Sequence, residues 1–305
     1  MLLSSKITPK TPEVSLIQAR ISFLKQCELS GLSDKYFHVI KYTTQRLLRF
    51  TYEFDLINIS DLSPKLAMDY FSRRSQDTTH IHYRSYDDNK RKKVSNETLN
   101  KELQILRRFC RHCIDMGWMD INPFRSIRSF KVDSHKQRYY FTDTDIETIM
   151  GKAGKFKDFY TLLLHTGLRS TDAYKLKKKH IQGRYLCIQM NKTKDTLNIP
   201  LPDTIIPLLK VILEDISGEN DLLFPHFQTN RQRRNCCKVV QGCFDIEMVR
   251  KNNINLHTFR HTYAHNMLNK GVPKEVLQTL LGHRSIKTTE IYANWVRKEE
   301  LERWV

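Results

Sequence analysis

The stretch HTFRHTYAHNMLNKGVPKEVLQTLLGHRSIKTTEIY, residues 257–292, carries the pattern that decides the fold of this chain. Its first helix-forming run contains His257 and Arg260, which are three residues apart and therefore share one face of a helix. A second run ends just before His283, and Tyr292 follows nine residues later. A turn and a further helix between His283 and Tyr292 would bring these two side chains towards the same centre.

The side-chain types in this stretch suit a reaction at phosphorus. A phosphodiester in its pentacoordinate state carries extra negative charge on its non-bridging oxygens, and the planar, permanently charged guanidinium of Arg is best suited to hold them. His donates to the same oxygens and moves protons near neutral pH. Tyr can attack phosphorus and form a covalent intermediate. Taken singly, however, a His-x-x-Arg pair or a Tyr near a C-terminus is more often structural.

Two motifs upstream add an Arg and a Lys. Thr166-Gly167-Leu168-Arg169 follows the run LLLH, which predicts the end of a helix. Further on, the strand-like runs 185–190 and 196–200 predict a β-hairpin whose turn holds Lys192 and Lys194. A Lys on such a turn can protonate a departing oxygen.

The N-terminal part of the chain predicts helices. From Ser95 to Gly117, apolar residues recur in steps of four, three, four and three, which predicts one helix with a continuous buried face. Its positions are Leu99, Leu103, Leu106, Cys110 and Cys113. A helix beginning at Ser33 is expected to bury Tyr36, Ile40, Leu47 and Phe50.

The polar segment KVDSHKQR, residues 131–138, predicts a linker between two domains, 1–130 and 139–305. The predicted fold class is mainly α with a small β-sheet (α+β).

Composition indicates a folded protein that binds nucleic acid. A hydrophobic content of 40% and an aromatic content of 10% favour a folded chain over a disordered one. The formal net charge is +18, and both halves are basic: residues 1–130 hold 22 basic and 14 acidic side chains, and residues 131–305 hold 29 and 19. Solubility needs only a modest net charge, whereas two basic halves suit a protein that grips a polyanion from both sides.

The sequence predicts no membrane association. No run approaches the roughly 20 apolar residues of a membrane span, and the start, MLLSSKITPKTPEVS, is typical of a short polar leader. We therefore expect a cytoplasmic protein, associated with the nucleoid if its source is bacterial.

Seven cysteines, irregularly placed, indicate reduced thiols. Cys110-x-x-Cys113 and the adjacent Cys236-Cys237 raise the question of zinc, but two adjacent cysteines lack the spacing of a ligand pair. Buried core thiols are the favoured interpretation, and no metal site is expected.

Taken in order, the motifs resemble those of the tyrosine recombinase (phage integrase) family, whose core runs Arg, Lys, His-x-x-Arg, His or Trp, Tyr. TGLR supplies the first Arg, HTFRH matches H-x-L-R-H with Phe for Leu, and LGH followed at nine residues by Tyr matches the closing block. GLSDKYFHVIKYTTQRLLRF and SNETLNKELQILRRFCRHCIDMGWMDINPF look like the helical, SAM-like core-binding domain that precedes the catalytic domain. Only about 15 residues precede the first helix, which favours the Xer-like two-domain form.

The resemblance implies how the phosphate is held. Arg169 and Arg260 would clamp the scissile phosphate, and His257 and His283 would donate hydrogen bonds to it. Asp172 fits the acidic position three residues after the first Arg, where it would support the site; a purely local ion pair would place an acid there equally well.

The resemblance also implies the reaction and its partners. Tyr292 would attack phosphorus and leave a 3′-phosphotyrosine, while Lys192 would protonate the leaving 5′-oxygen. The phosphotyrosine conserves the bond energy, so neither ATP nor a metal cofactor is expected. The implied partners are double-stranded DNA with paired half-sites and a homotetramer on synapsed DNA, with or without accessory proteins. The function would be integration, excision or resolution of a mobile or circular element.

Several basic side chains are candidates for contacts with DNA phosphates, although a charge run is usually a solvated face. They are Lys90, Arg91, Lys92, Lys93, Lys177, Lys178 and Lys194.

Two other functions compete with recombination. A type IB topoisomerase uses related chemistry, but that family usually has Lys at the position of His257. A non-catalytic DNA-binding protein could keep the fold, but here competent residues fill all of the motif positions. Cleavage of a suicide substrate separates an enzyme from a binder, and a two-site recombination assay separates a recombinase from a topoisomerase.

Lys192 is preferred to Lys194 as the general acid, because Lys-Thr directly follows the predicted strand. We expect Lys192→Ala to slow cleavage about 100-fold or more on ordinary DNA, yet to cleave a strand with a 5′-bridging sulfur at a near wild-type rate, because sulfur departs without protonation. Lys194→Ala should show a smaller defect that is similar on both substrates. Rescue of the Lys194 variant alone would exchange the two roles.

Overall fold

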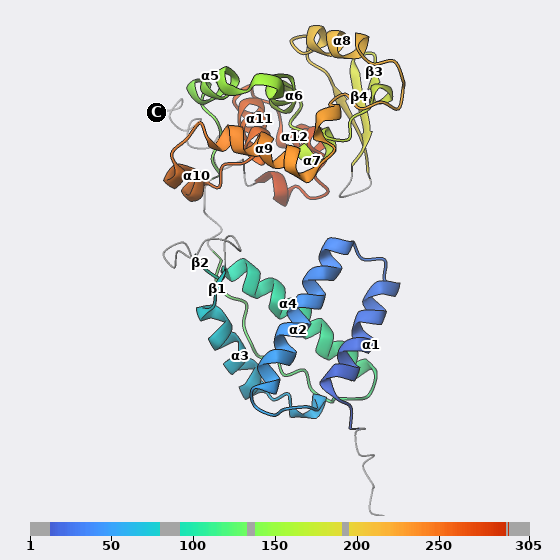
Figure 1. Cartoon of the computed structure of the whole chain (residues 1–305), viewed down its shortest axis with the longest axis vertical. Helices are drawn as coiled ribbons and strands as arrows, with labels where there is room; N and C mark the ends of the chain where they lie inside the picture. Colours follow the sequence, from blue (N-terminus) through green and yellow to red (C-terminus); the bar gives the residue numbers. More distant parts are fainter. Residues whose placement is uncertain (1–12, 80–91, 133–137, 191–194, 291, 293–305) are drawn as a thin grey trace, which may run out of the picture. The chain divides into compact units, whose positions relative to one another are not determined.

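A computed structural model describes residues 13–79, 92–132, 138–190, 195–290 and 292 (Figure 1). The chain divides between Ser134 and His135 into two compact units, and the predicted linker spans this division. Each unit is described by itself. None of the described helices is both long and apolar enough to cross a membrane.

The first unit is a set of helices around one apolar core. Its described elements are α1 (Leu16–Leu29), α2 (Asp34–Tyr52), the short 3-10 helix η1 (Ile59–Asp61), α3 (Pro64–Gln76), β1 (Thr78–Thr79), β2 (Lys92–Lys93) and α4 (Asn96–Asp115). The two short strands pair antiparallel.

The predicted buried face of α4 is confirmed. All five apolar positions from Leu99 to Cys113 are at most 1% exposed, and the Ser95 hydroxyl caps the helix by accepting from the backbone N–H of Thr98. On α2 the prediction was wrong at its first position: Tyr36 is 41% exposed. Phe37 packs on the core instead. Positions three and four before Ile40 both lie near its face of the helix, so the spacing alone does not choose between them.

A buried cluster of charges joins three helices of this unit. Arg74 on α3 donates from Nε and Nη2 to both carboxylate oxygens of Glu102 on α4, at 3.0 and 2.9 Å. Arg46 on α2 donates to the same carboxylate at 2.7 Å. Glu102 and Arg74 are 4% and 7% exposed, so each needs the other as a partner.

The second unit contains most of the described elements. They are α5 (Asp143–Lys152), η3 (Gly154–Phe156), α6 (Lys157–Thr166), α7 (Ser170–Ala173), η4 (Lys178–His180), β3 (Ile181–Gln182), β4 (Tyr185–Gln189), β5 (Thr196–Pro200), α8 (Ile206–Glu214), η5 (Pro225–Phe227), α9 (Asn230–Gln241), α10 (Ile246–Asn252), α11 (His257–Asn269) and α12 (Lys274–Leu281). This confirms the predicted fold class, mainly α with a small sheet.

The sheet is antiparallel, in the order β3-β4-β5. The predicted hairpin is present: Tyr185 pairs with Pro200 and Gln189 with Thr196. The N–H of Met190 donates to the carbonyl of Asp195 at 2.9 Å, which closes the base of the turn. The sequence did not predict β3, whose two residues are too few to show an alternating pattern.

Helix α11 lies inside the second unit, between α6 and α12 (Figure 1). It is buried on nearly all sides, since its buried residues occupy successive positions rather than one stripe. They are Thr258, Phe259, Arg260, Thr262, Tyr263, Ala264, His265 and Leu268. The polar residues among them are therefore held in fixed surroundings.

Two glycines end the helices that flank α11. Gly167 after α6 and Gly282 after α12 both have a left-handed backbone with φ of 60°. A Cβ on Gly167 would lie 2.4 Å from Cδ1 of Tyr263, and one on Gly282 would lie 2.6 Å from Cε of Met190. Both positions thus require glycine for its backbone freedom and for the close approach of a side chain.

Gly167→Ala should destabilise the protein more than Gly183→Ala. Gly183 is the matched control, because its φ is 59° and nothing lies within 4 Å of an added Cβ. Both variants place alanine in the left-handed region, at a cost of about 1–2 kcal/mol. Only Gly167→Ala also forces Tyr263 to move, which adds about 1–3 kcal/mol. Urea denaturation measures the difference; equal losses in the two variants would contradict the tight packing of Gly167.

Candidate active site

Three segments of the second unit meet at the guanidinium of Arg260, on α11. Its Nη1 donates to the carbonyl of Gly167 at 2.9 Å, and its Nη2 donates to the carbonyl of Leu281 at 2.6 Å. The same Nη2 lies 2.8 Å from Nε2 of His283. Arg260 is 1% exposed. One side chain therefore fixes the end of α6, the end of α12 and the histidine that follows α12.

The surroundings of Arg260 favour an anion. Its pKa is lowered to about 10, first by burial and then by the charge of Arg169, while Tyr292 and Asp172 act in the opposite direction. Its Nε is buried and has no acceptor among the described residues. A buried cation with an unpaired donor and a second cation close by is stabilised by a negatively charged ligand.

Arg169 and Asp172 stand at the start of α7, directly after Gly167. Nη1 of Arg169 lies 3.3 Å from the sulfur of Met190, at the end of β4. Asp172 is 5% exposed, and its N–H donates to the carbonyl of Arg169 at 2.9 Å. Its carboxylate is close enough to raise the pKa of Arg260. This location suits the supporting role predicted for Asp172.

His283 is held through both ring nitrogens. Because Arg260 can only donate, Nε2 of His283 accepts and Nδ1 carries the proton. Nδ1 then donates to the hydroxyl of Thr289, which is 2.9 Å away and fully buried. To donate from Nε2 to a phosphate, as the resemblance implies, the ring would have to turn or gain a proton.

Tyr292 reaches the same centre from the C-terminal side. It is 1% exposed, and its hydroxyl lies 2.9 Å from Nδ1 of His261. Burial raises its pKa, while Arg260, Arg138 and Arg169 oppose that rise. Its ring stacks on His283 with centroids 6.5 Å apart. The structure thus brings Tyr292 together with both motif arginines and with His283.

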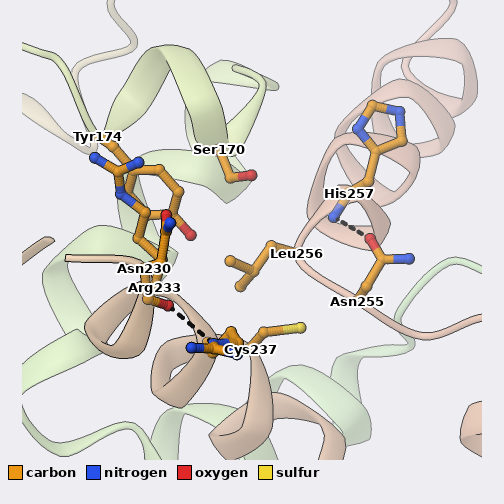
Figure 2. Close-up of a pocket in the computed structure, with 9 residues that line it drawn as sticks. Ser170, Tyr174, Asn230, Arg233, Cys237, Asn255, Leu256 and His257 are labelled. Carbon is orange, nitrogen blue, oxygen red and sulfur yellow. Dashed lines mark hydrogen bonds between the residues drawn. The ribbon is translucent and has the colours of Figure 1, made fainter. Parts of the chain in front are cut away.

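His257 is exposed and borders an open pocket of about 550 Å³ (Figure 2). Its backbone N–H donates to the side chain of Asn255 at 2.7 Å. Figure 2 shows Ser170 across the pocket from His257, and Arg233 and Arg234 of α9 also line it. No Asp or Glu is among the described lining residues, so the pocket suits an anion.

The other predicted residues divide into two groups. Four lie outside the described residues: Lys90, Arg91, Lys192 and Lys194. Lys92 and Lys93 form β2 of the first unit. Lys177 is half-buried, and the ammonium of Lys178 donates to the carbonyl of Ile216 at 2.6 Å. Lys178 therefore caps the chain after α8 in this arrangement.

Sequence reasoning missed two residues of this site, His261 and Thr289. His261 is the second His of HTFRH, and this motif could have indicated it. The family's pattern assigns roles only to His257 and Arg260. Nothing in the sequence marks Thr289, because its role depends on the turn that returns the chain to His283.

The structure places the cysteines of both pairs. Cys110, Cys113 and Cys236 are fully buried, as expected of core thiols, and Cys237 is half-buried. Within the described ranges, no group of three His, Cys, Asp or Glu side chains is arranged to hold a metal ion.

The fold is shared with DNA-bound integrases of known structure. A lambda integrase tetramer bound to a Holliday junction has a TM-score of 0.68 at 16% identity, over 92% of this chain and 77% of that one. The Tn1549 transposon integrase in complex with a circular intermediate DNA has a TM-score of 0.65, also at 16% identity, over 96% and 100%. At this level of identity the similarity establishes the fold.

Sequence comparison extends the similarity to the family. A tyrosine recombinase of Pseudothermotoga lettingae is 25% identical over 290 residues, covering 90% of this chain and 96% of that one. Another, from Thermosipho africanus, is 27% identical over 67% and 74%. The model of the phage integrase SAM-like domain matches residues 15–132, and that of the phage integrase family matches residues 140–299. The chain belongs to the phage integrase family, the tyrosine recombinases.

Proposed function

We propose that this protein is a site-specific recombinase that cuts and rejoins DNA through a covalent 3′-phosphotyrosine at Tyr292. The observation that carries the proposal is the convergence of a buried tyrosine hydroxyl and the Arg260 guanidinium at one centre. Cleavage and rejoining of DNA is the activity of the family to which the chain belongs.

In this proposal the two arginines hold the scissile phosphate. The guanidinium of Arg260 is immobilised by two backbone carbonyls, so it needs no reorganisation when charge develops on the phosphate oxygens. Arg169 supplies the second cation. The negative charge of Asp172 offsets part of the positive charge around Arg260. His257 and His283 complete the hydrogen bonds to the phosphate.

Cleavage exchanges one phosphoester bond for another. The Tyr292 oxygen loses its proton to a base and forms a bond to phosphorus, while the bond from phosphorus to the 5′-oxygen breaks and Lys192 supplies the proton for that oxygen. Resealing reverses each change, with the 5′-hydroxyl as the nucleophile. The energy of the broken bond stays in the phosphotyrosine, so no nucleotide cofactor enters the reaction.

Charge supports a long contact with DNA beyond the reacting phosphate. The net charge is +18, and the pocket beside His257 contributes Arg233 and Arg234 next to the proposed phosphate site. Phosphate contacts fix the position of a protein on the duplex without reading its sequence. We propose that the protein acts in the cytoplasm, and with the nucleoid if its source is bacterial.

A homotetramer on two synapsed duplexes is the proposed working assembly. Support comes from the lambda integrase tetramer on a Holliday junction, whose fold this chain shares. We propose that this assembly acts in the integration, excision or resolution of a mobile or circular element.

Tyr292→Phe should abolish the covalent protein–DNA adduct on a suicide substrate while leaving DNA affinity within about twofold. Only the nucleophilic oxygen is removed, so the loss of adduct should be complete to the detection limit. Denaturing gel electrophoresis measures the adduct, and a mobility-shift titration measures affinity.

Tyr263→Phe is the matched control. Tyr263 is also a buried tyrosine of the same apolar cluster, 4% exposed, and it should keep forming the adduct. A detergent-resistant adduct in Tyr292→Phe would show that another residue is the nucleophile.

A further inference from the structure

The nucleophile needs a group that takes its proton. Burial raises the pKa of Tyr292 above that of an ordinary tyrosine, so its hydroxyl is protonated at neutral pH and is a weak nucleophile. The roles proposed above hold the phosphate and protonate the leaving oxygen. None of them removes the proton from Tyr292.

His261 occupies the position from which that proton can be accepted. Its Nδ1 is 2.9 Å from the hydroxyl oxygen of Tyr292, and the two ring centroids are 5.5 Å apart. Arg260 also neighbours this hydroxyl and stabilises the phenolate through its charge and hydrogen bonding, but a guanidinium can only donate. Of these two neighbours, only His261 can receive the proton.

The environment of His261 keeps its ring neutral. Its pKa is lowered to about 3, first by burial and then by the positive charges or protonated forms of His257, Arg138, Arg260 and His283. A neutral imidazole has one nitrogen free to accept. The ring of His257 packs edge-on against His261 with centroids 4.8 Å apart, which helps to fix the ring plane.

We infer that His261 is a further catalytic residue, whose Nδ1 takes the proton of Tyr292 as the tyrosine oxygen attacks phosphorus. The inference rests on the proposed function of Tyr292. As the oxygen–phosphorus bond forms, the hydroxyl proton passes to Nδ1 and the imidazole becomes an imidazolium. In resealing, the same proton returns to the tyrosine oxygen as the phosphotyrosine bond breaks. No oxidant, metal or further reactant is needed.

Substrate binding raises the basicity of His261. The groups that oppose a positive charge on His261 are themselves cations or become cations on protonation: Arg260, Arg138, His257 and His283. A phosphodiester held between the arginines offsets their charge, and the developing negative charge on the phosphorane offsets it further. The imidazolium is therefore stabilised at the moment when the proton arrives.

His261→Asn separates proton acceptance from simple positioning. The Asn side-chain oxygen can take the place of Nδ1 and accept the tyrosine hydrogen bond, but it cannot hold the proton. We expect single-turnover cleavage of a suicide substrate at pH 7 to be at least about 100-fold slower than in wild type. DNA affinity should stay within about twofold.

The pH profile gives the decisive readout. With His261 present, the neutral ring is the active form, so the cleavage rate should level off between about pH 7 and pH 9. In His261→Asn the rate should follow the tyrosinate fraction and rise about tenfold per pH unit over this range, because the pKa of Tyr292 lies above it.

His265→Asn is the matched control. His265 lies one turn further along α11, stacked on Tyr140 at 3.6 Å, and its substitution should leave the pH profile unchanged. A wild-type rate in His261→Asn would overturn the inference, as would a slow rate whose profile runs parallel to that of wild type. Either result would leave the Tyr292 adduct intact, whereas loss of the Tyr292 assignment would appear separately as an adduct in Tyr292→Phe.

Discussion

The second unit depends on the guanidinium of Arg260, which is fully buried and donates to two backbone carbonyls. One carbonyl belongs to Gly167 at the end of α6 and the other to Leu281 at the end of α12. Helix ends carry unsatisfied carbonyls that need donors, so the same side chain completes both helices and links them to α11. Motifs that are far apart in the sequence are thereby fixed around a single charged group.

Burying a cation in this way is unfavourable unless something offsets it. Asp172 and the tyrosine hydroxyl offset it in part, but Arg169 lies close enough to oppose it. A protein selected for stability alone would replace such a pair with apolar side chains. The arrangement is consistent with a site prepared for an anion, in which the phosphate supplies the missing charge. The same close packing requires glycine at positions 167 and 282. A Cβ on Gly167 would meet the ring of Tyr263, and a Cβ on Gly282 would meet the side chain of Met190.

Much of this arrangement could be predicted from the sequence. The periodic face of α4 and the hairpin of β4 and β5 follow from local patterns, which is why they could be predicted. The phase of α2 at Tyr36 could not, because the choice between Tyr36 and Phe37 depends on which helix packs against the first turn. His261 and Thr289 were missed for a related reason. Each acts through a hydrogen bond to a residue that only the folded chain brings close: His261 to Tyr292, and Thr289 to His283.

In the proposed reaction the oxygen of Tyr292 becomes bonded to a DNA 3′-phosphate. The most direct measurement is tandem mass spectrometry of the wild-type protein after reaction with a suicide substrate and digestion with protease and nuclease. The predicted result is a nucleotide attached through its 3′-phosphate to the peptide that contains Tyr292, with fragment ions that locate it on that residue. A nucleotide on any other residue would show that Tyr292 is not the nucleophile, and one joined through a 5′-phosphate would show that cleavage has the opposite polarity.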